Sequence, residues 1–96
     1  PYGRYAAIIV SSEDRAAAEE TARMIGRTAP EIGEDMHVYG PAPAPLAMLR
    51  GRHRYRLPVH ARRSFDVHQV LRDWLGGLAW GPRVRVAVDV DPYSFV

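Results

Sequence analysis

The 96-residue sequence predicts one α+β domain with a single core. Its apolar content of 47% is normal for a globular protein and too high for a disordered chain. Two segments carry apolar residues at the spacing of one helix face, and four others have the continuous or alternating apolar pattern of strands. Their order is β-α-β-β-α-β, which predicts a two-layer sandwich with two helices on one face of a four-stranded sheet.

The first third of the chain predicts a buried strand followed by a helix. The nearly continuous apolar run from Arg4 to Val10 is typical of a strand buried on both faces. Ser11 and Ser12 are the expected N-caps of a helix that begins near Ala16 and ends at Pro30. The helix face that we expect to pack on the sheet consists of small and apolar residues, namely Ala18, Ala22, Ile25 and Ala29.

The middle of the chain predicts a short strand, an extended proline segment and a long strand. The short strand covers Met36 to Tyr39. Prolines 41, 43 and 45 are expected to stay out of a central ladder and to follow a polyproline-like path. From Arg52 to Ala61 the residues alternate between two faces, and Pro58 within this run predicts an edge position or a bulge.

The last third predicts a second helix and a closing strand. Ser64 is the expected helix cap, and Trp74 lies on an apolar stripe that continues to Leu78. Trp80 fits either a lid on the core or an exposed anchor. The run from Arg83 to Val90 alternates, so its valines should point inward. Together the elements predict a split-βαβ, ferredoxin-like fold whose second sheet face is open for binding.

Positive charge is concentrated in one part of the chain. From Met36 to Phe65 there are six Arg and three His but no Asp or Glu, although the formal net charge of the whole chain is only +2. The centre of this segment is an arginine ladder, by which we mean Arg50, Arg52, Arg54 and Arg56. Guanidinium groups bind phosphates in a bidentate manner, so the ladder predicts contacts with a polyanion such as DNA.

The aromatic residues and the helices refine this expectation. Tyr55 or His53, which alternate with the arginines, are candidates for stacking on a base. Sequence-specific readout is not expected, because the second helix carries only one arginine, Arg72. The alternative is that the ladder is a solvated outer face, or a basic edge that prevents strand pairing.

Several other functional classes are disfavoured by composition. The absence of cysteine excludes disulfides and thiolate metal sites and fits a reducing interior, and the absence of lysine excludes a Schiff-base or Walker-type lysine. The four histidines lack the paired spacing of a metal site. Asp89 and Asp91 share a strand face, but before Pro92 we interpret them as a solvated, turn-forming pair. No apolar run approaches the ~20 residues of a membrane span.

Three stretches together resemble a known family. They are GPAPAPLAMLRGRHRYR, which runs from Gly40 to Arg56, the opening PYGRYAAIIVS, and the ending RVRVAVDVDPYSF. In this order, and over essentially the whole chain, they resemble the C-terminal domain of primosomal protein N′, the bacterial replication-restart helicase family PriA. The resemblance implies that residues 1–96 are one small-ribosomal-protein-like, C-terminal domain of a longer cytoplasmic chain, which fits a start at Pro1 instead of Met.

The resemblance also implies partners and site residues. The parent chain would be an ATP-dependent 3′–5′ DNA helicase that uses Mg and Zn, whereas this fragment would be non-catalytic and hold no cofactor. It would help to bind forked or single-stranded DNA, and it would lie beside the site for the acidic tail of single-stranded-DNA-binding protein during primosome assembly. Arg62 and Arg63, just before the last helix, and His68 are the expected contacts with that tail. Pro58 departs from the aliphatic residue expected there.

The sequence leaves two other functions open. The domain could be a structural docking module that packs on the helicase lobes of the same chain and contacts DNA little, with the apolar run from Leu46 to Leu49 at the interface. An enzymatic function of its own is disfavoured by the lack of a phosphate loop, a nucleophile–base pair or a metal cluster in the sequence.

Overall fold

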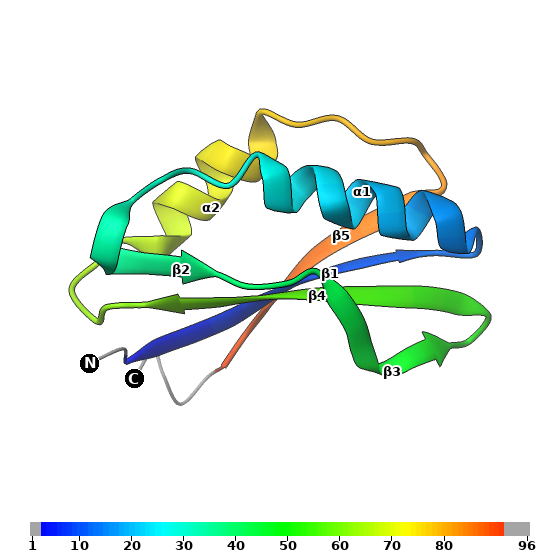
Figure 1. Cartoon of the computed structure of the whole chain (residues 1–96), viewed down its shortest axis with the longest axis horizontal. Coiled ribbons are helices and arrows are strands. Elements are labelled where there is room, and N and C mark those ends of the chain that lie inside the picture. The colour runs from blue at the N-terminus through cyan, green and yellow to red at the C-terminus, as the bar shows by residue number, and fades with distance from the viewer. Residues whose placement is uncertain (1–2, 92–96) are drawn as a thin grey trace.

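The computed structural model of the chain describes residues 3–91 and has two layers, with both helices on one face of an antiparallel sheet (Figure 1). The turn expected at Pro92 lies outside the described residues. The strands are β1 (Arg4–Ser12), β2 (Met36–Val38), β3 (Ala42–Leu49), β4 (Arg52–Ala61) and β5 (Val84–Val90), and the helices are α1 (Arg15–Arg27) and α2 (Val67–Gly76). A short 3-10 helix, Gly33–Asp35, precedes β2.

The sheet has the order expected for a split-βαβ fold. Strands β4 and β1 lie in the centre, β2 and β5 flank them, and every pairing is antiparallel. The predicted fold class is therefore confirmed. The structure adds one strand to the prediction, because β3 pairs with β4 on the same side as β2.

Strand β3 is the proline-alanine segment for which a polyproline-like path was the expectation. It forms a hairpin with β4 through a two-residue turn in which Arg50 and Gly51 have φ angles of 52° and 77°. Two positive φ angles in sequence are typical of the tight turns that match the twist of hairpin strands. The prolines are tolerated because β3 is an edge strand and its pairing is interrupted between Pro43 and Met48.

The prediction of an edge position or a bulge at Pro58 was wrong. Strand β4 is central, and its register with β1 is continuous along its described length. The Pro58 carbonyl accepts a hydrogen bond from the Tyr39 N–H at 2.8 Å, on the side of β2. In an antiparallel strand the N and O atoms of one residue point the same way. The Pro58 nitrogen, which has no hydrogen to donate, therefore points to the gap between Val38, where β2 ends, and Ala42, where β3 begins.

The core lies between the sheet and the two helices. The predicted inward residues of α1 and α2 are buried or packed against this core, which confirms both helix faces. Its central side chains are fully buried and come from four elements, namely Ile8, Ile25, Leu57, Val59 and Val67. Trp74 is buried as expected, and its indole N–H donates a hydrogen bond to the Thr28 hydroxyl at 3.1 Å.

The helix caps differ from the expected serines. Asp14 caps α1 by accepting hydrogen bonds from the N–H groups of Ala16 and Ala17, and Asp66 caps α2 by accepting one from Gln69. Ser12 cannot serve as the cap because β1 continues through it, and its hydroxyl instead accepts a hydrogen bond from the Asp14 N–H. The predictions that placed Ser11, Ser12 and Ser64 at the caps were therefore wrong.

The closing strand β5 is less covered than the sequence predicts. Val84 is buried, but Val88 is 39% exposed although it lies on the helix face of the sheet. Trp80 is partly buried and packs against the core, which favours the lid over the anchor. Within residues 3–91, no helix is long and apolar enough to cross a membrane.

Candidate nucleic-acid interface

The face of the sheet that the helices leave open carries the arginines of β4. Leu57 and Val59 point into the core, so alternation places Arg52, Arg54 and Arg56 on the opposite face. This confirms the predicted division of β4 into two faces. Ser11 of β1 lies opposite Arg54 on one side and opposite Arg85 of β5 on the other. Directly opposed residues of antiparallel strands share a face, so Arg85 joins the basic surface.

Two of these arginines also hold the hairpin in place. The Arg52 guanidinium donates to the Ser11 carbonyl at 2.9 Å and more weakly to the Arg83 carbonyl at 3.4 Å. Arg54 donates to the Leu46 carbonyl at 2.9 Å, across the interruption in the β3 ladder. Carbonyl oxygens do not neutralise a guanidinium, so both groups keep their full charge and several unused donors.

Arg56 and Arg85 are the more available members of this surface. Both are exposed, and neither has a hydrogen bond or ion pair recorded with any residue between 3 and 91. Arg50 is exposed in the hairpin turn, before the first residue of β4. The predicted arginine ladder is therefore one continuous strand face for three of its residues, and Arg50 stands apart from it.

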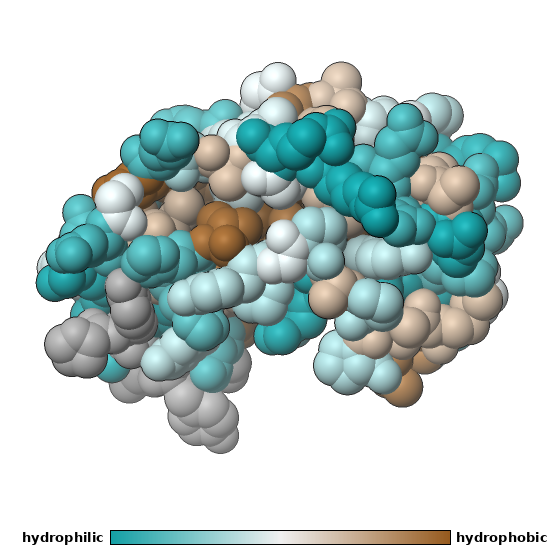
Figure 2. Space-filling model, in the orientation of Figure 1, coloured by the Kyte–Doolittle hydropathy of each residue, from teal (hydrophilic) through white to brown (hydrophobic). Residues whose placement is uncertain are grey.

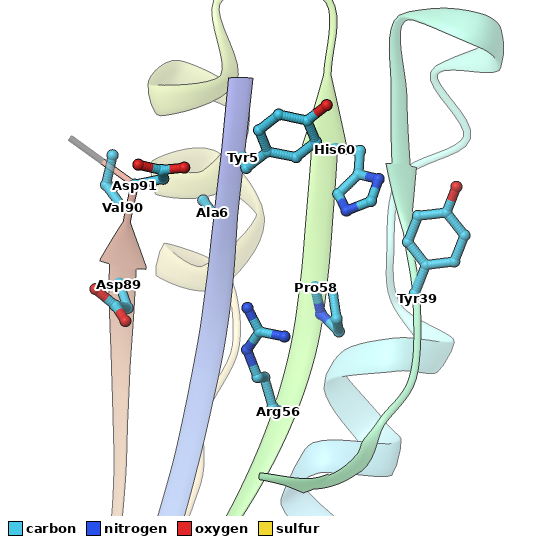
Figure 3. Close-up of a pocket in the computed structure, with 9 residues that line it drawn as sticks. All are labelled: Tyr5, Ala6, Tyr39, Arg56, Pro58, His60, Asp89, Val90 and Asp91. Atoms are coloured by element: carbon cyan, nitrogen blue, oxygen red, sulfur yellow. The ribbon is translucent and has the colours of Figure 1, made fainter. Parts of the chain in front are cut away.

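Next to Arg56 the open face is hollowed. The hollow has a volume of about 580 Å³ and is shown in Figure 3. Three aromatic rings line it, from β1, from β4 and from the residue that follows β2: His60 is 4.8 Å from Tyr5 and 5.0 Å from Tyr39, measured between ring centroids. Its other lining residues are Ala6, Arg56, Pro58, Asp89, Val90 and Asp91. The open face therefore has a basic end and an aromatic end, with the carboxylates at the aromatic end.

Sequence reasoning found only part of this hollow. The alternation of β4 placed His60 on the arginine face, and the spacing of Asp89 and Asp91 placed these two on one strand face. Tyr5 and Tyr39 were missed, because they reach the hollow through the pairing of β1 and β2 with β4. Such long-range register has no local signal.

Tyr55, a candidate for base stacking, lies on the other face of the sheet. It is partly buried and packs against the core below the helices. A side-chain hydrogen bond with Tyr55 raises the pKa of Arg15, with a further contribution from Glu19. His53 lies two residues before Tyr55 in β4, so its side chain is on the same face of the sheet as Tyr55. We therefore leave both rings out of the interface.

The residues expected to contact an acidic tail lie elsewhere. Arg62 forms loose ion pairs with Glu34 at 3.5 Å and Asp35 at 3.6 Å, beside the 3-10 helix. Arg63 is exposed, and its carbonyl accepts a hydrogen bond from Arg4 at 2.7 Å. His68 lies in the first turn of α2 and lines a groove of about 420 Å³ between α2 and β5. The remaining lining of this groove is mainly apolar and consists of Leu71, Arg72, Leu75, Gly76, Trp80, Val88 and Val90.

The hairpin presents a further exposed surface. Leu46, Met48 and Leu49 of β3 are 59%, 52% and 42% exposed. Figure 2 shows apolar residues gathered at the lower right, where the hairpin lies in Figure 1. Among residues 3–91, no group of three or more His, Asp or Glu side chains is placed to hold a metal ion.

Comparison with known proteins identifies the family. The family described as "Primosomal protein N C-terminal domain" matches residues 1–93. The chain belongs to this family. It is 30% identical over 95 residues to "Replication restart protein PriA" of Rickettsia conorii, covering 99% of this chain. It is also 36% identical over 95 residues to "Probable replication restart protein PriA" of Deinococcus radiodurans, covering 98% of this chain.

These relatives are much longer proteins. The chain spans 14% of the length of the Rickettsia conorii protein and 10% of the Deinococcus radiodurans protein. The match confirms the family resemblance given by the arginine-rich run and by the two ends of the sequence.

Proposed function

We propose that this PriA-family domain is a non-catalytic DNA-binding module that acts in replication restart and binds single-stranded or forked DNA through its open sheet face. The observation that carries the proposal is the clustering of Arg52, Arg54, Arg56 and Arg85 on one uncovered surface. Open faces of such two-layer folds bind nucleic acid in several unrelated modules.

The charge distribution along the face supports phosphate binding at one end. The basic end combines residues from β4 and β5, and about 6.8 Å separates successive arginines along one strand. The acidic residues of the face, Asp89 and Asp91, are at the other end, beside the aromatic rings. A nucleic-acid backbone is therefore attracted to the basic half of the sheet.

The second proposed partner is single-stranded-DNA-binding protein, through its acidic tail. Arg62, Arg63 and His68 remain the candidate contacts, and they lie away from the basic end of the open face. The ion pairs of Arg62 are long and exposed, so they cost little to exchange for a carboxylate of a partner. DNA and the tail would then bind without competing for the same side chains.

The proposal is tested by the salt dependence of DNA binding. The affinity of the 96-residue chain for fluorescent single-stranded and forked DNA is measured by anisotropy between 50 and 200 mM salt. Four phosphate contacts predict a slope near −2.8 on single strands, so that affinity falls about 50-fold over this range. The double variant Arg56→Ala/Arg85→Ala should show a slope near −1.4 and a fall of about 7-fold.

A matched control removes the same charge from the helix side. Arg23 and Arg27 of α1 are exposed and lie on the opposite side of the sheet, so Arg23→Ala/Arg27→Ala should keep the wild-type slope. Equal losses in the two double variants would mean that only net charge matters, and that result would refute the open face as the site.

One observation favours a second function. The exposed apolar side chains of β3 are typical of a surface that another protein covers, and the chain spans only a small part of the length of its relatives. The domain would then be a docking module that packs on the rest of the parent chain. This function predicts that the isolated chain does not bind DNA at 50 mM salt, and that Leu46→Ser/Met48→Ser raises its solubility.

A further inference from the structure

The hollow beside Arg56 has a composition that phosphate binding does not explain. Its rings come from β1, β4 and the residue that follows β2, and the carboxylates of Asp89 in β5 and of Asp91 just after it face the same space. A pure phosphate site would exclude carboxylates, because like charges repel a bound anion. The volume of about 580 Å³ lies within the range of small-molecule sites.

The aromatic rings support one another and still leave surface for a ligand. Tyr5 meets His60 edge to face, with an interplanar angle of 84°, and Tyr39 is tilted by 56° from His60. Because no two of these rings are stacked in parallel, their faces are not fully used by each other. Tyr39 is 47% exposed, and Figure 3 shows its ring at one wall of the hollow with His60 between it and Tyr5.

The charged groups are ordered along the strands. Asp89 lies opposite Ala7, which lies opposite Pro58, so these three residues form one cross-strand row. Arg56 lies two residues before Pro58, toward the basic end. In Figure 3 its guanidinium points into the space between Pro58 and Asp89. A ligand in the hollow thus meets a cation on the side of the basic surface and a carboxylate at its other edge.

We propose that the hollow binds one unstacked nucleobase of single-stranded DNA. The base stacks on Tyr39, and its phosphate is held by Arg56, whereas Asp89 lies three strand spacings from Tyr39 and is out of reach of the stacked base. Stacking on an aromatic ring tolerates any base, so the site takes cytosine and thymine alike. This inference rests on the proposed function, because the strand reaches the hollow from the basic end of the same face.

The test compares variants of the hollow with the arginine variant. The 96-residue chain is titrated with fluorescent dC12 and dT12 at pH 7.5, in its wild-type form and as Tyr39→Ala, Tyr39→Phe and Asp89→Ala. The exposed ring of Tyr39 makes a folding defect small, and the melting temperature of each variant is measured alongside. Stacking predicts that Tyr39→Ala binds dC12 at least ~5-fold more weakly while Tyr39→Phe retains wild-type affinity. The salt slope should be unchanged in both.

Base preference is the second readout. Wild type should bind dC12 and dT12 about equally, and Asp89→Ala should leave this ratio unchanged even if its lower negative charge strengthens binding overall.

Three outcomes would overturn the inference. If Tyr39→Ala binds like wild type while Arg56→Ala/Arg85→Ala weakens binding, the hollow does not take a base and the proposed function stands. If Tyr39→Phe is as weak as Tyr39→Ala, the ring is not a stacking platform. If wild type binds neither oligonucleotide at 50 mM salt, the proposed function and this inference fail together.

Discussion

Gly40 is the position where a single methyl group should most disturb the arrangement of the open face. It has a φ angle of +79°, in the left-handed region that residues with a side chain rarely adopt. A Cβ atom there would lie 2.8 Å from the carbonyl oxygen of Arg56 and 3.1 Å from the backbone nitrogen of Ala42. Both neighbours are backbone atoms, so neither can move aside without shifting β3 or β4.

The cost of Gly40→Ala has two parts. Adopting the left-handed conformation costs an alanine about 1–2 kcal/mol. The close contact adds about 1–3 kcal/mol, as overpacking does elsewhere in protein cores. The sum is near 3 kcal/mol, and for a domain of this size each kcal/mol lowers the melting temperature by about 4–8 °C. We therefore expect Gly40→Ala to melt roughly 12–24 °C below wild type.

Gly33→Ala is the matched control. Gly33 also has a positive φ, +77°, but its added Cβ would have no atom within 4 Å. It should therefore lose only the conformational part, about 1–2 kcal/mol. Thermal unfolding followed by circular dichroism gives both values. Equal melting temperatures for the two variants would refute the close approach of the β2–β3 connection to β4, and with it the position of β3 beside the arginines.

Two further predictions concern the helices that support the sheet. Trp74→Ala should lower the free energy of unfolding in urea by about 3–5 kcal/mol, because it empties a buried site. Thr28→Val loses the hydrogen bond to the indole and should lower it by about 1 kcal/mol. Similar losses in the two variants would mean that Trp74 is not packed in the core. Asp14→Ala should destabilise the domain by about 1 kcal/mol, and Ser11→Ala by clearly less, because Asp14 is the N-cap of α1. A larger loss in Ser11→Ala would instead support the serine cap that the sequence suggested.

Local periodicity made much of the fold predictable. The alternation in β4 gave its buried residues and its basic face, and the apolar stripe of α2 gave the burial of Trp74. Both signals repeat within a few residues, so they do not depend on knowing the neighbours. The caps were less predictable because serine and aspartate serve equally well. The choice was decided by where β1 ended, at Ser12.

The composition of the hollow depended on contacts between distant segments. Tyr5 and Tyr39 meet His60 only because β1 and β2 pair with β4 in one register, and a shift by one residue would send their rings to the other face. The same limit applies to Arg52, whose contact with the Ser11 carbonyl joins residues 41 positions apart. The edge pairing of β3 escaped prediction because its prolines, which argue against a central ladder, favoured a polyproline-like path.

The most direct test of DNA binding by the open face follows the arginine side chains themselves. Nε–Hε correlations of the chain are recorded by nuclear magnetic resonance while a forked oligonucleotide is added at low salt. The account predicts that the signals of Arg52, Arg54, Arg56 and Arg85 shift, whereas those of Arg23, Arg27 and Arg72 on the helix side do not. Shifts confined to the helix side, or no shift at saturating DNA, would contradict it.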